Sequence, residues 1–383
     1  MSESYRRPVP RWVHVWAIAC VCITTGLLVL GSMVTSFRVG MSDPIWPTEP
    51  WYLFFIRWSE PDAGFLIEHI HRLAGFTVGG VVSILAIGLW WTEKRKAAKW
   101  IGLVALVVLL GEFGRFHGLM MKQVHEPKVT WPMIPLISMG VSLAVVVLIA
   151  ITGNLLRLLG VLALVGVMIQ GLLGGLRVRL NELFGTDLAM VHGIFAQVVF
   201  ALLVTIAVLT ARRKVGEEVL NESRLRFWTL MLVGSAFIQL VWGAMVRHHG
   251  TSVMQRLHFM TAFVVFGFAL WTVREAMNAR SWPRWSFTCK LLMGFLAFQI
   301  LLGVEAWMGK FYGTLTPELD MVTKGKALTR SLHVLFGTGV LAISTVLAVL
   351  VRRSPLAEDI LSDEEVDSMR GEFIVAESVG GRT

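Results

Sequence analysis

Ten apolar segments constrain the fold of this chain more than any other feature of its sequence. A helix that crosses a lipid bilayer needs about 20 mostly apolar residues. The segments that meet this requirement are 12–35, 70–91, 99–116, 132–152, 155–176, 189–210, 227–246, 257–273, 290–309 and 331–351. Soluble domains carry roughly 25% charged residues, whereas this chain carries 16%. A soluble enzyme and a disordered chain are therefore excluded, and we expect an all-α polytopic membrane protein with about ten spans.

The positive charge of the chain, a net +9, is concentrated in alternate connecting segments. The segments at 94–99, 212–226 and 274–290 hold many of its basic residues. By the positive-inside rule we expect these segments and both termini to be cytoplasmic. Topology thus accounts for the charge, so we expect membrane lipid and no nucleic acid as a partner. The start of the chain is interpreted as an uncleaved first span, and 352–383 as a mobile acidic cytoplasmic tail.

Four histidines lie at the same end of their predicted spans: His71, His192, His258 and His333. Each is followed four residues later by Gly or Ala, which lies on the same helix face. A small residue one turn below an imidazole leaves room for a flat ligand, and paired inward-facing histidines hold haem iron in helical bundles. Two alternatives are open. The histidines are merely solvated at the interface, or they bind zinc; isolated histidines without a cysteine partner disfavour zinc.

A second pattern indicates an internal duplication. Three of the spans that precede these histidines contain Gln-x-x-x-Gly, at Gln170–Gly174, Gln239–Gly243 and Gln299–Gly303. The span before His71 lacks the glutamine. Small-residue spacing alone is a common helix-packing signal in lipid, but the order of glutamine spans and histidine spans favours two four-helix bundles.

One ionisable residue stands out at membrane depth, where such side chains are costly and often functional. Glu68 lies three residues before His71, which places it close to a ligand bound at that histidine. The alternative is an interfacial carboxylate that pairs with Arg72.

Several arginines lie near the same span ends as the four histidines. Because arginine makes forked contacts with carboxylates, we expect some of them to bind haem propionates; the alternative is side chains that reach the interface without a ligand. The candidates are Arg72, Arg177, Arg179, Arg247, Arg256 and Arg330.

Several stretches of the chain resemble the haem A synthase family. They are Glu68-His69-Ile70-His71-Arg72, Gly31-Ser-Met-Val-Thr-Ser leading to Gly40-Met-Ser-Asp-Pro-Ile-Trp, Gln170-Gly-Leu-Leu-Gly-Gly-Leu-Arg-Val, and Leu332-His333. The resemblance covers about residues 11–97 and 155–351. That family converts haem O to haem A for terminal oxidases. The resemblance implies two four-helix bundles related by a pseudo-twofold axis.

Carried over to this chain, the resemblance implies two haem sites. It places the substrate haem O between His71 and His192, places haem b between His258 and His333, and makes Glu68 the catalytic residue. The implied reaction is two successive oxidations of one ring methyl, after which the resulting gem-diol loses water to give the formyl group of haem A.

Two features depart from the family pattern. Residues 98–153 have no counterpart in an eight-span member, and we expect them to form an inserted transmembrane hairpin. The expected domains are therefore 1–210, which includes this insertion, and 211–351. Many bacterial members also have a cysteine pair in an outward loop, whereas the outward loops expected here contain no cysteine.

The expected function is a haem A synthase-like oxidoreductase in a bacterial cytoplasmic membrane. Its expected partners are the enzyme that supplies haem O, an unidentified electron donor or acceptor, and the terminal oxidase under assembly. The rival interpretation is a non-catalytic bis-His two-haem electron-transfer cytochrome, which needs the four histidines but not Glu68. A third class, a haem-binding transporter or assembly partner, needs only the helical bundle.

Overall fold

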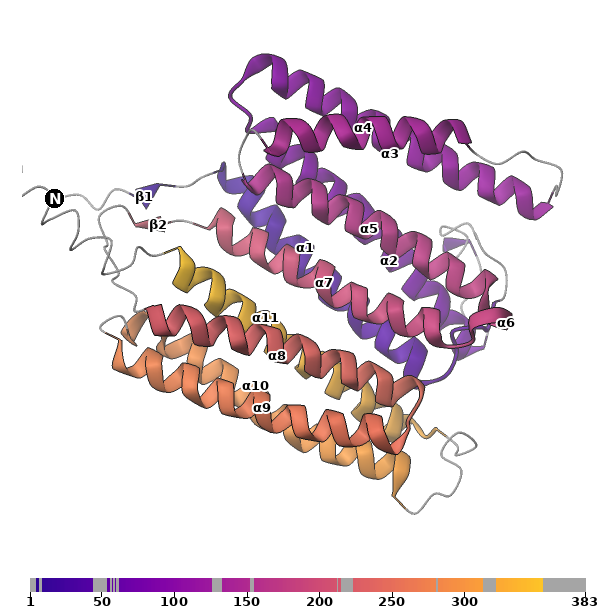
Figure 1. Ribbon diagram of the computed structural model, residues 1–383. Helices are drawn as coiled ribbons and strands as arrows, with labels where there is room; N and C mark the ends of the chain where they lie inside the picture. The colour runs from indigo at the N-terminus through magenta and orange to yellow at the C-terminus, as the bar shows by residue number, and fades with distance from the viewer. Residues whose placement is uncertain are drawn as a thin grey trace, which may run out of the picture.

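The chain folds into long helices that run roughly parallel to one another (Figure 1). The computed structural model describes residues 5–6, 9–43, 54–55, 57, 59, 62–125, 133–151, 155–211, 213–214, 223–279, 282–312 and 322–353. In this part of the chain, ten helices are long and apolar enough to cross a membrane. The prediction of an all-α multi-pass membrane protein is confirmed. The acidic tail predicted beyond Arg353 lies outside the described residues.

Eight of the ten helices form two four-helix bundles. In each bundle every helix packs against its two neighbours around the ring. The first bundle contains α1 (Arg11–Ser36), α2 (Ala63–Trp91), α5 (Leu155–Arg179) and α7 (Asp187–Thr210). The second contains α8 (Ser223–His248), α9 (Ser252–Asn278), α10 (Trp282–Phe311) and α11 (Lys324–Arg352). The same order of helices around the same kind of ring agrees with the duplication predicted from the sequence.

The remaining two long helices form a hairpin on the outer side of the first bundle (Figure 1). Helices α3 (Lys96–His125) and α4 (Met133–Ile151) pack on each other and against α2 and α5. The hairpin shares a hydrophobic core with the first bundle, in which Leu106, Leu109 and Val146 are almost fully buried. Three short elements complete the fold: α6 (Asn181–Phe184) and an antiparallel pair of strands, β1 (Tyr5–Arg6) and β2 (Arg213–Lys214).

The two ends of the bundles differ in their polar contacts. We call the end where α1 begins and α11 ends the terminal end, and the opposite end the histidine end. At the histidine end, a side chain caps the start of three of the four histidine-bearing helices: Asp62 caps α2, Thr251 caps α9 and Thr323 caps α11. These caps satisfy backbone N–H groups that the helix itself leaves unpaired, which fixes where each of these helices begins.

Polar contacts at the histidine end also join the two bundles. The Arg247 guanidinium on α8 donates hydrogen bonds to the carbonyl of Ser32 and the hydroxyl of Ser36 on α1, at 2.6 and 2.8 Å. The Ser331 hydroxyl on α11 donates to the Ser36 hydroxyl at 3.1 Å. The bundles therefore meet through specific hydrogen bonds as well as through the packing of α11 against α1 and α7.

The buried core of both bundles stops short of the histidine level. In α2 no residue between His69 and Val78 is buried, and in α9 the first buried residue is Val265. In α11 the run of buried residues is interrupted between Ser331 and Gly337. Side chains at the level of the four histidines are therefore not packed tightly against one another.

Two helices are longer than the apolar segments that predict them. Segments 99–116 and 257–273 lie within α3 and α9, which have 30 and 27 residues. Helix α3 ends only at His125. In both cases the helix continues beyond the apolar run, because backbone hydrogen bonding carries through polar residues at the ends of a span.

Candidate functional site

Each of the four predicted histidines lies against a glycine of the preceding helix in its bundle. A methyl group on that glycine would lie 2.9–3.5 Å from the imidazole Cε1 atom. The pairs are Gly31 with His71, Gly174 with His192, Gly243 with His258, and Gly303 with His333. The glycines let each imidazole approach the neighbouring backbone closely, and the repeated Gly–His contact is the shared element of both bundles.

The two histidines of the second bundle face each other. The ring centroids of His258 and His333 are 6.2 Å apart and the rings are nearly perpendicular, at 80°. Two imidazoles bound to opposite faces of one metal ion place their centroids about 6 Å apart, because metal–nitrogen bonds are about 2 Å long. The geometry of this pair therefore fits axial ligands of a single haem iron.

The two histidines of the first bundle are also brought together. His71 on α2 and His192 on α7 are close enough for their imidazoles to interact electrostatically, and Arg177 acts on both. All four histidines are partly buried. Among the described residues, no group of three or more His, Cys, Asp or Glu side chains is arranged to hold a metal ion.

The carbonyl four residues before each glycine faces the corresponding imidazole. In the second bundle, Nδ1 of His333 lies 3.2 Å from the Gln299 carbonyl oxygen. A hydrogen bond from Nδ1 to a backbone carbonyl fixes the imidazole tautomer and leaves Nε2 as the metal-binding atom. The equivalent carbonyls near the other three histidines belong to Leu27, Gln170 and Gln239. Within the described part of the chain these three Nδ1 atoms form no hydrogen bond of standard geometry.

The glutamines predicted from the repeat do not all make the same contact. In the second bundle, the side-chain amides of Gln239 and Gln299 lie 3.4 and 3.5 Å from Nε2 of His258 and His333. In the first bundle, Gln170 donates to the backbone carbonyl of His192. The glutamine amides therefore lie beside histidine Nε2 atoms only in the second bundle.

The small residues predicted one turn after the histidines also differ between the bundles. A methyl group at Gly75, four residues after His71, would have no described atom within 4 Å. In the second bundle, Gly337, four residues after His333, is buried, and a methyl group there would lie 3.0 Å from the amide nitrogen of Gln299. The expected room for a flat ligand beside the helix is present at Gly75, whereas at Gly337 the glutamine fills it.

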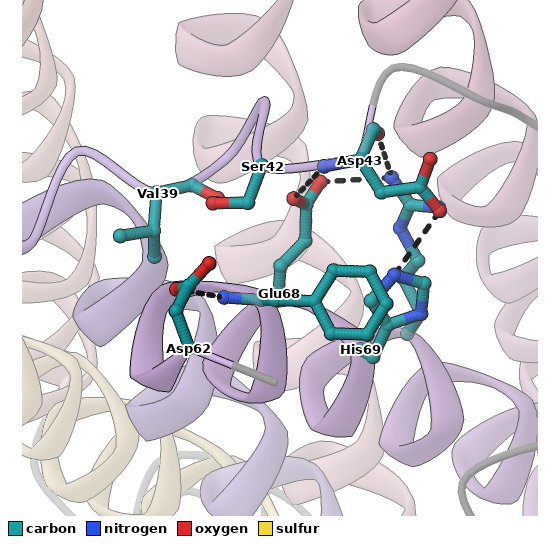
Figure 2. Close-up of polar contacts among 8 residues, drawn as sticks. Val39, Ser42, Asp43, Asp62, Glu68 and His69 are labelled. Atoms are coloured by element: carbon teal, nitrogen blue, oxygen red, sulfur yellow. Dashed lines mark hydrogen bonds and ion pairs between the residues drawn. The ribbon is translucent and has the colours of Figure 1, made fainter. Parts of the chain in front are cut away.

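Glu68 is buried in a polar cluster beside the first histidine pair, nearer the start of α2 than His71. Its Oε1 atom accepts a hydrogen bond from Arg72 at 2.8 Å, and its Oε2 atom accepts one from the Asp43 backbone N–H at 3.0 Å. Nε2 of His69 lies 3.1 Å from an Asp43 carboxylate oxygen. Figure 2 shows Asp43, in the segment that follows α1, facing both Glu68 and His69 on α2. The pairing of Glu68 with Arg72 that the sequence left as an alternative is present.

The second bundle has no carboxylate at the position equivalent to Glu68. Three residues before His258 the chain has Gln255, whose amide donates to the Gly250 carbonyl and accepts from the Trp307 indole N–H. A neutral side chain thus occupies the place that an acidic one takes in the first bundle. The two histidine sites share a scaffold but differ in charge.

The predicted arginines lie in different environments. Arg177 donates to the Gly40 carbonyl at 2.9 Å, and Arg330 donates to the Gly309 carbonyl at 3.0 Å. Arg72 is held by Glu68 and Asp43, and Arg256 is exposed on the surface. The side chains of Arg72 and Arg177 both lie within electrostatic range of His71.

Two residues of the site were not selected from the sequence. Asp43 lies beyond the end of an apolar segment, where a lone acidic residue is ordinary, and His69 has no small residue four positions on. Arg247 was one of several arginines near the span ends, and nothing in the sequence shows that it bridges the bundles. The available signal for Asp43 was its place within a motif that resembles the haem A synthase family.

Comparison with known proteins identifies no relative of this chain. No family model matches it, and no curated protein and no solved structure is significantly similar. The residues and the geometry of the two histidine sites therefore carry the functional argument.

Proposed function

We propose that this chain is a haem-binding membrane oxidoreductase that oxidises a ring methyl of haem O to the formyl group of haem A. The observation that carries the proposal is the Gly–His contact repeated in both bundles, with His258 and His333 set 6.2 Å apart between ring centroids. Paired axial histidines on facing helices are the arrangement by which helical bundles hold haem. The resemblance of the sequence to haem A synthases supplies the reaction.

In this proposal His258 and His333 hold haem b, which when bound supplies a one-electron relay. His71 and His192 hold the substrate haem O. The glycines opposite the histidines hold each imidazole against the neighbouring helix, and the carbonyl of Gln299 orients His333. Arg177 lies near the first pair, where it is placed to bind a carboxylate of the substrate.

The difference in charge between the two sites supports placing the proposed chemistry in the first bundle. Both carboxylate oxygens of Glu68 already accept hydrogen bonds, so this side chain is better placed to stabilise positive charge that develops on a substrate than to take up a proton. Arg72 and the Asp43 backbone hold the carboxylate in position. Gln255 cannot supply a negative charge at the second site. A site without this charge suits an electron relay.

The proposal includes the setting of the reaction. The histidine end faces outward, both termini lie in the cytoplasm, and the membrane is a bacterial cytoplasmic membrane. The partners are the enzyme that supplies haem O, the terminal oxidase that receives haem A, and an electron donor or acceptor. The concentration of basic residues in the connections of the terminal end supports this orientation.

Pigment analysis tests the proposal directly. The full chain is expressed in a strain that has haem O but lacks its own haem A synthase, and the haems of the purified protein and of the cells are extracted. We expect haem A in the cells, and haem b together with haem O or haem A on the protein. Haem b alone, with no haem A in the cells, would instead indicate the electron-transfer cytochrome.

The ligands are tested by single substitutions. We expect His258→Ala and His333→Ala each to abolish the low-spin b-type spectrum, because each removes one of two axial ligands. The matched control is His117→Ala, which removes a partly buried histidine of the hairpin. An unchanged spectrum in both second-bundle variants would remove the haem b assignment.

A further inference from the structure

A cleft of about 670 Å³ opens between α8 and α9 at the terminal end, far along the helices from the histidines. Helix α8 contributes Arg224, Phe227 and Trp228, and helix α9 contributes Trp271, Arg274, Glu275 and Asn278. Arg224 lies in the first turn of α8 and Asn278 is the last residue of α9. The cleft therefore lies where two spans meet the boundary of the bilayer, at the level of lipid headgroups.

The most informative residue of this cleft is Glu275. This residue is only 7% exposed, and it lines the cleft. Within the described part of the chain its carboxylate forms no hydrogen bond or ion pair, although two arginines line the same cleft, and its oxygens are open to the cleft. A carboxylate on a largely buried residue is unfavourable without a partner. Its position points to a ligand that brings a cationic or hydrogen-bond donor group into the cleft.

The side chains that line the cleft suit a ligand with a small cationic group next to an anionic group. The indole rings of Trp228 and Trp271 lie 5.2 Å apart between centroids, inclined at 43°. Aromatic faces of this kind attract ammonium groups. The Arg274 guanidinium carbon lies 5.1 Å from the Trp271 ring centroid, and both Arg274 and Arg224 are exposed at the rim, where they can bind phosphate oxygens.

We propose that this cleft binds the headgroup of an aminophospholipid from the surrounding membrane. The ammonium group pairs with Glu275 beside the two indoles, and the phosphate pairs with Arg274 and Arg224. The acyl chains follow the exposed side chain of Phe227 into the bilayer. An anionic lipid without an amine would satisfy the arginines and leave the carboxylate unpaired. This site is independent of the histidine sites and of the function proposed for them.

The experiment uses the full chain, depleted of lipid in detergent and titrated with defined lipids while bound lipid is counted by native mass spectrometry. We expect phosphatidylethanolamine to be retained more strongly than phosphatidylglycerol. Glu275→Gln removes the charge that binds the amine, so retention of phosphatidylethanolamine should fall about tenfold, and phosphatidylglycerol should bind no more weakly than before. Arg274→Gln should weaken both lipids.

The matched control is Glu112→Gln, which neutralises a carboxylate of α3 that already has Arg115 as a partner. This variant should retain both lipids as the wild type does. Equal retention of phosphatidylethanolamine by the wild-type protein and Glu275→Gln would overturn the proposal, as would an isoprenoid quinol that copurifies and is lost in Glu275→Gln. If Glu275→Gln fails to fold, Arg274→Gln provides the test, because the Arg274 side chain is exposed and its replacement should not disturb folding. Unchanged retention of phosphatidylethanolamine by Arg274→Gln would then reject the site.

Discussion

Glu68 and Gln255 show how a single residue distinguishes two otherwise similar sites. Each lies three residues before a histidine that packs on a glycine of the neighbouring helix. Glu68 is 3% exposed and is bound by Arg72, whereas Gln255 makes neutral hydrogen bonds. A carboxylate at membrane depth is costly unless it is paired or used. At this position, three residues before a histidine, it occurs on α2 and is replaced by a glutamine on α9, which supports the proposal that the first bundle carries the chemistry.

Replacement of Glu68 by Gln should therefore separate activity from haem b binding. The change keeps the size and the hydrogen-bonding capacity of the side chain but removes its charge, so haem A formation should fall by about 100-fold or more. The haem b spectrum should remain, since His258 and His333 lie in the other bundle. Haem A per cell, measured by pigment extraction and normalised to folded protein, is the readout.

The control for this variant is Glu93→Gln. Glu93 at the terminal end is also buried and is paired with Arg157 at 3.1 Å, so its neutralisation breaks a comparable ion pair far from the histidines. It should lower stability and leave haem A formation per folded protein unchanged. If Glu68→Gln made haem A at the wild-type rate, the catalytic assignment would be wrong.

Glu93 also makes stability depend on pH. Hydrogen bonds from Arg95, with a further contribution from Arg157, lower the pKa of this carboxyl from 4.5 to about 2 despite its burial. A lowered pKa in the folded state stabilises the protein above the unfolded value, and this stabilisation is lost as the pH falls towards the folded value. The effect should therefore be complete above about pH 4.5 and disappear towards about pH 2.

Melting temperatures of the purified protein in detergent provide the measurement. At about pH 6 the wild type should melt several degrees above Glu93→Gln, and at about pH 3 the difference should be clearly smaller. A difference that stays constant over this range would show that Glu93 does not contribute through its charge.

Among the helices, α3 and α4 stand apart, because they add two spans to a pair of four-helix bundles. Their attachment is specific: the Trp90 side chain, fully buried at the end of α2, packs over Gly102 of α3 and donates its indole N–H to the Lys99 carbonyl at 3.1 Å. The hairpin packs against α2, α5 and the first bundle's core. It is an integral part of the first bundle.

Gly102→Ala tests this attachment. The added methyl group would overlap the Trp90 indole, and overpacking of this kind costs about 1–3 kcal/mol. The matched control is Gly111→Ala on the same helix, where the methyl group meets no described atom within 4 Å and helix propensity rises. Denaturant or thermal unfolding should show a loss of stability for Gly102→Ala only. Equal stability of the two variants would contradict the packing at Trp90.

Across the whole molecule, an even number of spans brings both ends of the described helical region to the terminal end. The Arg353 guanidinium, just after α11, donates to the carbonyls of Val208 and Ala211 at the end of α7, and His14 near the start of α1 contacts the Thr210 hydroxyl. The histidine sites lie at the opposite end, so the orientation of the protein in the membrane decides which compartment they face.

Single cysteines in a variant without the three native cysteines measure that orientation. Lys324 begins α11 at the histidine end and Lys96 begins α3 at the terminal end, and both are exposed. A membrane-impermeant thiol reagent should label Lys324→Cys in intact cells and Lys96→Cys only after permeabilisation. The reverse pattern would place the histidine sites on the cytoplasmic side.

The sequence by itself determined the all-α class, the ten spans and the shared end at which the four histidines lie. It could do so because a helix in lipid must pair its own backbone groups, so a long apolar segment specifies a helix whatever its neighbours are. The order of glutamine spans and histidine spans also predicted a duplicated scaffold.

Only the tertiary structure decided which residues of different helices meet. The contact of His71 with Gly31, the hydrogen bond from the Asp43 backbone to Glu68 and the bridge from Arg247 to Ser32 each join separate elements. Such contacts depend on how closely and in what rotation the helices pack, and packing in lipid is governed by the fit of small and polar residues between helices rather than by hydropathy. The hydropathy pattern is local to each span and contains no information about that fit.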